Sequence, residues 1–228
     1  MAQDNSVSRA CVCVFTKAPI PNQVKTRLLP VITADQACAL HTSLTRHCLE
    51  SIQDPGWHTQ IWSTDPADPF FNLYKASCLF QQEGGGLGER MTNAVLDNRD
   101  AYDFVVIVGT DCPQIETGMI TAALDQLRNG KDVVLGPAED GGYVLIGFAT
   151  KASSKALDVF TDINWGTDQV LAQTRARIVS IGLETAELNH CRDIDRPEDL
   201  QWLSNAYPEI YASIGVSEAL PQSDHEPG

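Results

Sequence analysis

The stretch FVVIVGTDCP, residues 104–113, joins five consecutive apolar residues to a turn that carries a single acid. An uninterrupted run of β-branched and aromatic residues predicts a strand covered on both faces, as in the centre of a parallel sheet. In open sheets of that kind, ligands bind beyond the carboxyl ends of the strands. The pattern therefore places the Gly-Thr-Asp turn where a binding site is expected.

Similar apolar runs lie on both sides of this stretch and alternate with segments of helical spacing. A capping box at residues 33–36 predicts the start of a long helix, which Asp54-Pro55-Gly56 ends. The alternation predicts one three-layer α/β/α domain over residues 1–220 with a mostly parallel mixed sheet, followed by a disordered tail at 221–228. Further strands are predicted at 11–15, 58–63, 77–81, 132–136, 143–148 and 176–183.

Composition narrows the class of partner. Asp and Glu total 30 against 16 Lys and Arg, and the net charge of -14 disfavours nucleic acid and anionic membranes. The polar start of the chain is unlike a secretory signal, so a cytoplasmic protein is expected. Seven cysteines lack a disulfide spacing, and Cys11 and Cys13 are predicted to be buried. The histidines lack metal-binding spacing, and His41 and His47 are expected on the flanks of the first helix.

The loop after the first strand carries Lys17, Lys25 and Arg27, three cations within eleven residues of an otherwise acidic chain. Such a cluster suits the phosphates of a nucleotide, because both ammonium and guanidinium groups donate to phosphate oxygens. The alternative is a solvated loop with ordinary surface charges.

Asp111, in the turn after residues 104–108, is a candidate ligand for Mg²⁺ or Mn²⁺, which bind one or two carboxylates together with substrate phosphates. The alternative is that it caps the following helix. Asp193 and Asp195 offer further carboxylates, because residues two apart in extended backbone point the same way. Helix capping accounts for the neighbouring acids at 198–199 but not for this pair.

A further candidate segment is GPAEDGGYVLIG, residues 136–147, in which Glu139 and Asp140 precede Gly141 and Gly142. The glycines permit close approach of a ligand to the backbone, or they make a tight hairpin. The glycine-rich run at 84–88 matches no named phosphate-binding motif, but Arg90, which follows it at the start of a helix, is a candidate for nucleotide binding.

Six motifs, in this order along about residues 11–205, resemble those of one bacterial family. The motifs are FTKAPIPNQVKTRL, GGGLGERM, VGTDCP, GPAEDGGYVLIG, INWGT and DIDRPEDL. The family comprises small nucleotide-diphospho-sugar transferase-like proteins of the arsenosugar-biosynthesis-associated glycosyltransferase type. It is similar, more distantly, to the 2-phospholactate and molybdenum-cofactor guanylyltransferases. The resemblance implies a GT-A type fold that binds a nucleotide and a divalent metal.

The resemblance also implies roles for single residues. It assigns Lys17, Lys25 and Arg27 to the phosphates, and Asp111, Asp193 and Asp195 to Mg²⁺ or Mn²⁺. Asp140, Gly141, Gly142 and Trp165 would border the second substrate. Asn22 stands where the family usually has glycine, and asparagine still permits a left-handed turn. Gly86 replaces a residue that is often polar.

The leading hypothesis is a metal-dependent glycosyltransferase that moves a sugar from a nucleotide sugar to a small acceptor, with Asp140 or Glu139 as base. One alternative is a nucleotidyltransferase that releases pyrophosphate, and the other is a non-catalytic nucleotide-binding protein. The nucleobase, sugar, acceptor, stereochemistry and oligomeric state stay open at this point.

Overall fold

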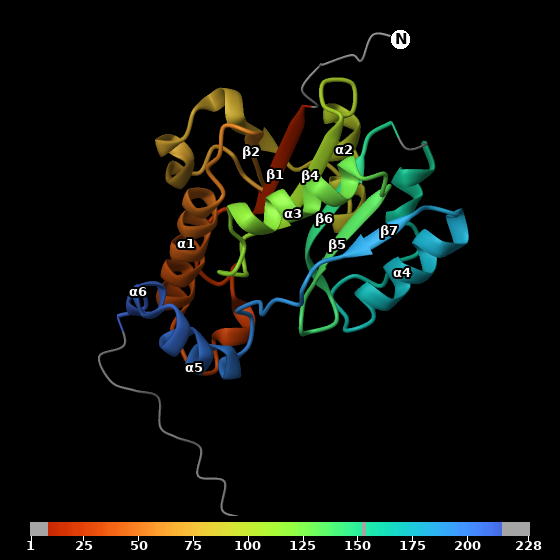
Figure 1. Cartoon of the computed structure of the whole chain (residues 1–228). Helices are drawn as coiled ribbons and strands as arrows, with labels where there is room; N and C mark the ends of the chain where they lie inside the picture. Colours follow the sequence, from red (N-terminus) through yellow and green to blue (C-terminus); the bar gives the residue numbers. More distant parts are fainter. Residues whose placement is uncertain (1–8, 152–153, 216–228) are drawn as a thin grey trace, which may run out of the picture.

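The sheet that the sequence predicts is present, with seven strands within the described residues, 9–151 and 154–215 of the computed structural model (Figure 1). Its strand order is β3-β2-β1-β4-β6-β5-β7. Strand β6 pairs antiparallel with β4 and β5, and the remaining pairs are parallel, which confirms a mostly parallel mixed sheet. The strands are β1 (Ala10–Thr16), β2 (His58–Ser63), β3 (Leu79–Gln81), β4 (Phe104–Gly109), β5 (Val133–Pro137), β6 (Tyr143–Ala149) and β7 (Thr185–Glu187).

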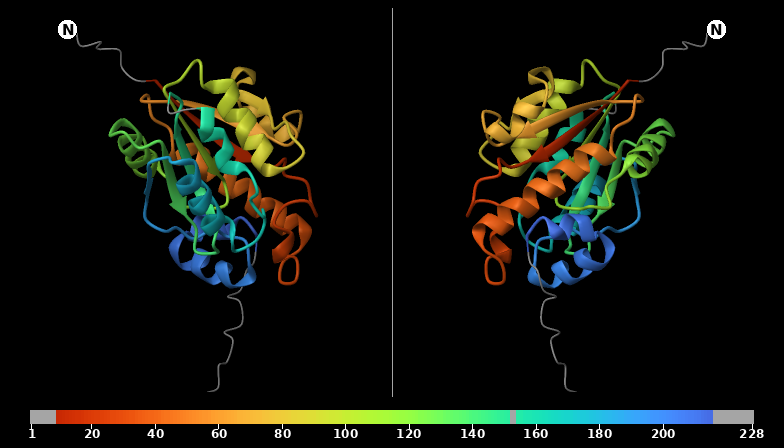
Figure 2. Two further views of the ribbon diagram at one scale, coloured as in Figure 1. Left: turned by 90° about the vertical axis from the view of Figure 1, so that its right-hand side faces the viewer. Right: turned by 90° about the vertical axis from the view of Figure 1, so that its left-hand side faces the viewer.

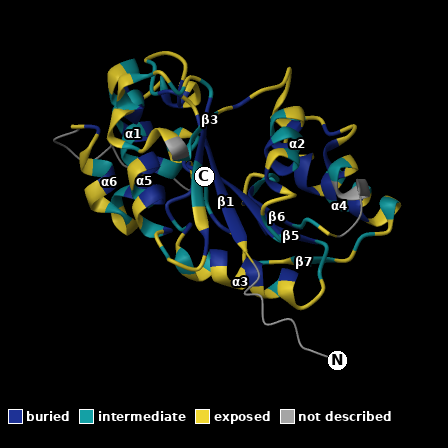
Figure 3. Ribbon diagram, turned by 90° about the horizontal axis from the view of Figure 1, so that it is seen from above, coloured by how far each residue is buried: buried dark blue, intermediate teal, exposed yellow. Residues whose placement is uncertain are grey.

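Helices cover both faces of this sheet. Seen from above in Figure 3, α1 (Ala34–Ser51) lies on one side, and α2 (Leu87–Asn98) and α4 (Val170–Ile181) lie on the other. Along β1, Val12 and Val14 pack in the core beneath α1 and α3 (Thr117–Arg128). Cys11 and Cys13 face α2 and α4 and are fully buried, as predicted. Burial on both faces explains the uninterrupted apolar runs.

The end of the described chain packs on α1. Helices α5 (Pro197–Ala206) and α6 (Pro208–Ala212) lie beside α1 in both views of Figure 2. Leu40 and Leu44 of α1 share a core with Ile194 and Leu200. This core holds the acidic segment before α5 next to the loop that follows β1. Short 3-10 helices complete the chain: η1 (Thr26–Leu28), η2 (Pro69–Leu73), η3 (Ala76–Cys78) and η4 (Ser154–Phe160).

The prediction of a strand at residues 176–183 is wrong, because α4 continues to Ile181. The last strand, β7, begins only at Thr185. Residues Ile178 and Val179 suggested a strand, but the core-facing positions of this segment recur three or four residues apart, as in a helix. Val179 lies on the outer face with 74% of its surface exposed. The tail predicted at 221–228 lies outside the described residues. Among the described helices, none has the length and apolar character needed to cross a membrane.

The predicted capping box at the start of α1 is confirmed. The Thr33 hydroxyl accepts a hydrogen bond from Gln36 N, at 3.2 Å, and Thr33 N donates to Gln36 Oε1 at 2.9 Å. The two bonds satisfy backbone and side-chain groups at the helix start that otherwise lack a partner. The cap therefore helps to fix the helix that supplies His41 and Thr45 to the site described below.

We predict that Thr33→Ala lowers the free energy of unfolding by about 1 kcal/mol, because the cap is lost. Urea denaturation provides the measurement. Thr121→Ala is the matched control, since Thr121 is an exposed interior residue of α3. Alanine favours a helix interior, so the control should be neutral or slightly stabilised. Equal destabilisation of the two variants would contradict a capping role.

Candidate functional site

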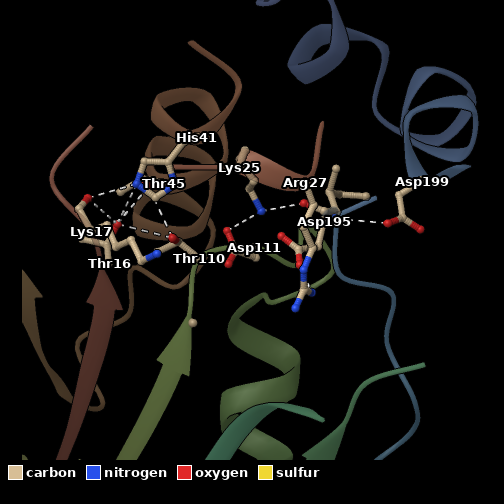
Figure 4. A network of polar contacts seen from close by, with 12 residues as sticks. Thr16, Lys17, Lys25, Arg27, His41, Thr45, Thr110, Asp111, Asp195 and Asp199 are labelled. Carbon is tan, nitrogen blue, oxygen red and sulfur yellow. Dashed lines mark hydrogen bonds and ion pairs between the residues drawn. The ribbon is translucent and has the colours of Figure 1, made fainter. Parts of the chain in front are cut away.

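The loop after β1 turns Lys25 into the interior. Asn22 and Lys25 both have left-handed backbone, with φ of 65° and 48°. Only 2% of the Lys25 side chain is exposed, and its Nζ lies 2.5 Å from Asp111 Oδ1 (Figure 4). The same Nζ donates to the Ile194 carbonyl oxygen at 2.5 Å. One ammonium group thus joins the loop after β1, the turn after β4 and the segment before α5.

Asp111 carries a stabilised negative charge. Desolvation by the surrounding protein would raise the pKa of its carboxyl, but attraction by Lys25, His41 and Lys17 outweighs this and lowers that pKa overall. Half of its side-chain surface, 51%, remains exposed. The carboxylate is therefore ionised at neutral pH and accessible to a ligand.

A buried polar cluster supports this arrangement from the side of α1 (Figure 4). His41 Nε2 donates to the Lys17 carbonyl oxygen at 3.0 Å and lies 3.4 Å from Thr16 Oγ1. Thr16 Oγ1 lies 3.2 Å from Thr45 Oγ1 and accepts from the Thr110 hydroxyl at 3.4 Å. The cluster ties the ends of β1 and β4 to α1.

His41 was expected on the flank of α1, and that expectation is wrong, because only 5% of its surface is exposed. Burial, the largest effect, lowers the pKa of its imidazole. A signal was present in the sequence: His41 and Thr45 lie one turn apart, beside the apolar positions Leu40 and Leu44. Polar residues at i and i+4 along an apolar stripe indicate a buried polar pair.

The acids before α5 have different partners. Asp195 Oδ2 lies 2.5 Å from a guanidinium nitrogen of Arg27. Asp193 forms no salt bridge with the other described residues, and its pKa is raised to about 6 by burial, then by the negative charges of Asp140 and Asp195. Asp199 accepts hydrogen bonds from the amides of Asp195 and Arg196 and so caps α5. The pair at 193 and 195 thus faces both the basic loop and Asp140.

The turn that carries Asp140 is packed against the start of α4. Gly141 has a φ of 90°, and a Cβ there would overlap the carbonyl oxygen of Asp168. Leu171 N donates to the Gly141 carbonyl at 2.8 Å, and Asp140 Oδ1 accepts from Gly142 N at 2.8 Å. The glycine therefore allows the close approach of two backbones, which fixes Asp140.

A cavity of about 240 Å³ opens beside this turn on the side of α2 and α4. We call it the aromatic cavity. Trp165 in its wall packs against α2 at Gly88, where a Cβ would lie 3.0 Å from the indole nitrogen. Its ring meets that of Tyr143 edge to face, with centroids 6.3 Å apart. The lining includes Phe15, Leu87, Met91, Tyr143, Trp165 and, among polar residues, Arg27, Asp140, Asp168 and Arg196.

A second cavity of about 320 Å³ adjoins it, and we call it the acidic cavity. Asp140, Asp168 and Arg196 line both cavities, so these residues mark the junction. The other lining residues are Glu139, Arg192, Asp193, Asp195, Glu198 and Asp199. The excess of carboxylates gives this cavity a negative potential.

The structure brings together most of the residues predicted for the site. Lys25 contacts Asp111, Arg27 contacts Asp195, and the charge of Lys17 acts on Asp111. Arg192 Nε lies 2.8 Å from Glu139 Oε2 and forms a salt bridge with it. Asp140, Gly142 and Trp165 line the aromatic cavity. Gly141 does not line it but packs against the backbone of Asp168, which does. Arg90 is among the described residues but lines neither cavity, and its Nε donates to the Gly84 carbonyl oxygen.

The side chains near Asp111 have the oxygen-donor chemistry of Mg²⁺ and Mn²⁺ sites. Within residues 9–151 and 154–215, no three His, Cys, Asp or Glu side chains are placed to hold an ion by themselves. Such an ion needs only one or two carboxylates when substrate phosphates supply further ligands. Lys25 contacts Oδ1 of Asp111, which leaves Oδ2 for an ion. The residues fit a cation that the substrate helps to bind.

We predict that Gly141→Ala destabilises the fold by about 2–4 kcal/mol, because the methyl group forces the turn away from Asp168. Gly130→Ala is the matched control, since Gly130 has a similar φ of 94° but open space around its Cβ position. The control should cost about 1 kcal/mol from backbone strain alone. Equal shifts in thermal unfolding temperature for the two variants would contradict the close packing of the turn.

The raised pKa of Asp193 leads us to predict that the stability of the protein depends on pH. Its pKa is about 6 in the folded protein, above the ordinary value of 3.8, so its favourable contribution is present below pH 4 and is lost as the pH rises through 6. In chelator, Asp193→Asn should therefore gain stability over the wild type between pH 4 and pH 8, by about 1–2 kcal/mol after allowance for solvent screening. Denaturation curves at both pH values measure this gain.

The control for that experiment is Asp100→Asn, which removes the same charge from a side chain that is 96% exposed. Its stability difference from the wild type should stay nearly constant over the same pH range. An Asp193→Asn difference as flat as that of the control would show that the carboxyl is not perturbed.

Known proteins share this architecture. A family model described as "Uncharacterized protein conserved in bacteria (DUF2064)" matches residues 48–167. A crystal structure of a provisionally assigned nucleotide-diphospho-sugar transferase from Desulfovibrio desulfuricans G20 is 31% identical, with a TM-score of 0.80, covering 91% of this chain and 94% of that chain. The comparison with curated proteins returns no match.

More distant solved structures show the fold alone. Molybdopterin-guanine dinucleotide biosynthesis protein A from Archaeoglobus fulgidus is 14% identical, with a TM-score of 0.54, covering 87% of this chain and 99% of that chain. The 2-C-methyl-D-erythritol 4-phosphate cytidylyltransferase of Francisella tularensis is 12% identical, with a TM-score of 0.53 and coverages of 86% and 99%. With the family match over more than half its length, the chain belongs to the bacterial DUF2064 family and has the nucleotide-diphospho-sugar transferase fold.

Proposed function

We propose that this protein is a metal-dependent glycosyltransferase that moves a sugar from a nucleotide sugar to a small-molecule acceptor. The observation that carries the proposal is the buried Lys25, which joins a cation-bearing loop to Asp111 at the carboxyl ends of β1 and β4. The coarser conclusion, a transferase that uses a nucleotide, is supported by the 31% identical relative. The aromatic cavity beside this point supplies room for a second substrate.

The basic loop would act on the donor. As the glycosidic bond breaks, negative charge accumulates on the leaving diphosphate. Lys25 is almost fully buried, so its charge acts with little screening by water, and Lys17 and Arg27 lie on the same loop. These cations would bind the diphosphate in the ground state and favour its departure. A Mg²⁺ or Mn²⁺ ion held by Asp111 and Asp193 together with the donor phosphates would supply further neutralising charge.

Asp140 is the favoured base for the acceptor hydroxyl. It lies at the junction of the two cavities, so a hydroxyl placed there is within reach of both the acid and the donor site. Glu139, the other candidate, is engaged by Arg192 at 2.8 Å. One oxygen of its carboxylate, Oε2, is therefore already occupied. The proton of the acceptor would therefore pass to the Asp140 carboxylate as the new bond to the sugar forms.

The charge of the acidic cavity favours glycosyl over nucleotidyl transfer. A nucleotidyltransferase must bind a phosphorylated second substrate, and the carboxylates that line this cavity would repel it. Arg192, which lines this cavity, is already engaged by Glu139. A neutral acceptor meets no such repulsion. Nucleotidyl transfer remains the competing function, and pyrophosphate release from a nucleoside triphosphate is its signature.

The test is a panel of nucleotide sugars and nucleoside triphosphates, with Mn²⁺, Mg²⁺ or chelator. We expect a nucleotide sugar to bind and to release its nucleoside diphosphate only with the metal. Lys25→Met and Arg27→Ala should each weaken nucleotide binding by about tenfold or more, the worth of a charge-assisted hydrogen bond. Lys131→Met is the control, because Lys131 pairs with Glu184 away from the site.

Arg27 is half-exposed, so its variant keeps the test valid if Lys25→Met fails to fold. Asp140→Asn should bind the nucleotide sugar normally and lose most of its turnover. If pyrophosphate is released from a nucleoside triphosphate, the protein is a nucleotidyltransferase and the proposed glycosyl transfer is wrong. Nucleotide affinity that is unchanged by chelator, without turnover, would indicate a binding protein instead of an enzyme.

A further inference from the structure

We propose that the aromatic cavity binds the acceptor, and that the acceptor is a hydroxylated molecule with one apolar six-membered ring. The inference deepens the proposed function and rests on it. The ring would lie between α2 and the segment that carries Trp165, with its hydroxyl group directed to Asp140 at the junction of the cavities.

The size of the cavity limits its ligand to about one ring. Its volume is about 240 Å³. An apolar cavity of about 150 Å³ holds a benzene molecule, so the space suffices for a single ring with a short substituent. Pockets that enclose a whole drug-sized ligand are larger, at about 300–1,000 Å³. A nucleotide sugar is therefore too large to lie within it.

The walls favour an apolar ring over a sugar ring. Phe15, Met91 and Trp165 present aromatic and thioether surface, and Ile107, Val144 and Val170 add aliphatic surface. A sugar has a hydroxyl on nearly every carbon, and each hydroxyl that loses water without a new partner costs about 1–3 kcal/mol. An apolar ring instead gains from leaving water and from contact with the aromatic side chains.

The aromatic wall is held in place before a ligand arrives. Trp165 packs between Gly88 of α2 and the rings of Phe160 and Tyr143, with centroid distances of 6.2 Å and 6.3 Å. A wall fixed by several neighbours loses little conformational freedom on binding, which favours affinity. The glycine at 88 is needed because any side chain there would displace the indole.

Three polar residues, Asp140, Asp168 and Arg196, lie where the two cavities meet and would orient the ligand, whereas Arg27 and Thr167 line the aromatic cavity alone. Asp140 and Asp168 are exposed carboxylates that line both cavities. They accept hydrogen bonds from a hydroxyl group and repel a carboxylate or phosphate. The two carboxylates therefore favour a hydroxyl group at this end of the acceptor, directed toward the proposed base.

The experiment compares three small alcohols as probes: benzyl alcohol, cyclohexylmethanol and myo-inositol. Each contains a six-membered ring, but inositol carries a hydroxyl on every carbon. We expect the first two to bind in nuclear magnetic resonance titrations, and to accelerate release of nucleoside diphosphate from the donor. Inositol should do neither. Stronger binding or faster turnover with inositol would overturn the proposal in favour of a sugar acceptor.

Variants locate the binding. Leu87 lines the cavity as the first residue of α2 and is 45% exposed, and an acid in the first turn favours a helix, so Leu87→Glu should fold. We expect it to weaken benzyl alcohol binding by about tenfold, and to change nucleotide affinity by less than about twofold. Trp165→Ala should act in the same way. Leu73→Glu, at a 75% exposed position that does not line the cavity, is the control.

The outcomes separate the two proposals. Equal binding of benzyl alcohol to Leu87→Glu and the control would overturn this inference. A parallel loss of nucleotide affinity in Leu87→Glu would also overturn it, because the cavity would then hold part of the donor. Failure of the proposed function looks different: no nucleotide sugar binds to the wild type, whatever the alcohols do.

Discussion

The ion pair between Lys25 and Asp111 organises the site. An ammonium group that is buried without partners costs several kcal/mol, and Lys25 avoids this cost through Asp111 and the Ile194 carbonyl. Ile194 is itself fully buried in the core that α5 shares with α1. The position of a lysine near the start of the chain therefore depends on helices near its end.

The two faces of the sheet have different roles at this edge. On the side of α1, threonines and His41 form a hydrogen-bonded cluster with the backbone of the loop after β1. On the side of α2 and α4, aromatic and aliphatic side chains enclose the aromatic cavity. Arg27 connects the charged groups to the aromatic cavity, because it contacts Asp195 and lines that cavity. This division suits a reaction that joins a charged donor to a less polar acceptor.

The acids around the junction are crowded at a cost in stability. Asp193 lies near the negative charges of Asp140 and Asp195, and burial and these charges raise its pKa. Such an arrangement is unfavourable in the free protein and becomes favourable when a cation or proton arrives. Packing elsewhere offsets the cost, above all in the two cores that lie on either face of β1 and β4. Functional sites commonly retain strain of this kind.

The segments that form the site, and most of the strands and helices, could be predicted from the sequence. Apolar runs marked β1 and β4, a capping box marked α1, and acids or glycines after strands marked the loops that converge. Local patterns carry this information because strand and helix preferences act over a few neighbouring residues. The same limit explains the error in α4, where a short run of β-branched residues suggested a strand within a helix.

The partners of the site residues were decided by the tertiary structure alone. Arg27 meets Asp195 across 168 positions of sequence, Trp165 packs on Gly88, and Gly141 touches the backbone of Asp168. Burial of His41 likewise depends on the loop that folds over it. Charge and apolar character determined which residues are suited to a site. The order of strands in the sheet determined which of them meet, because that order places distant segments side by side at one edge.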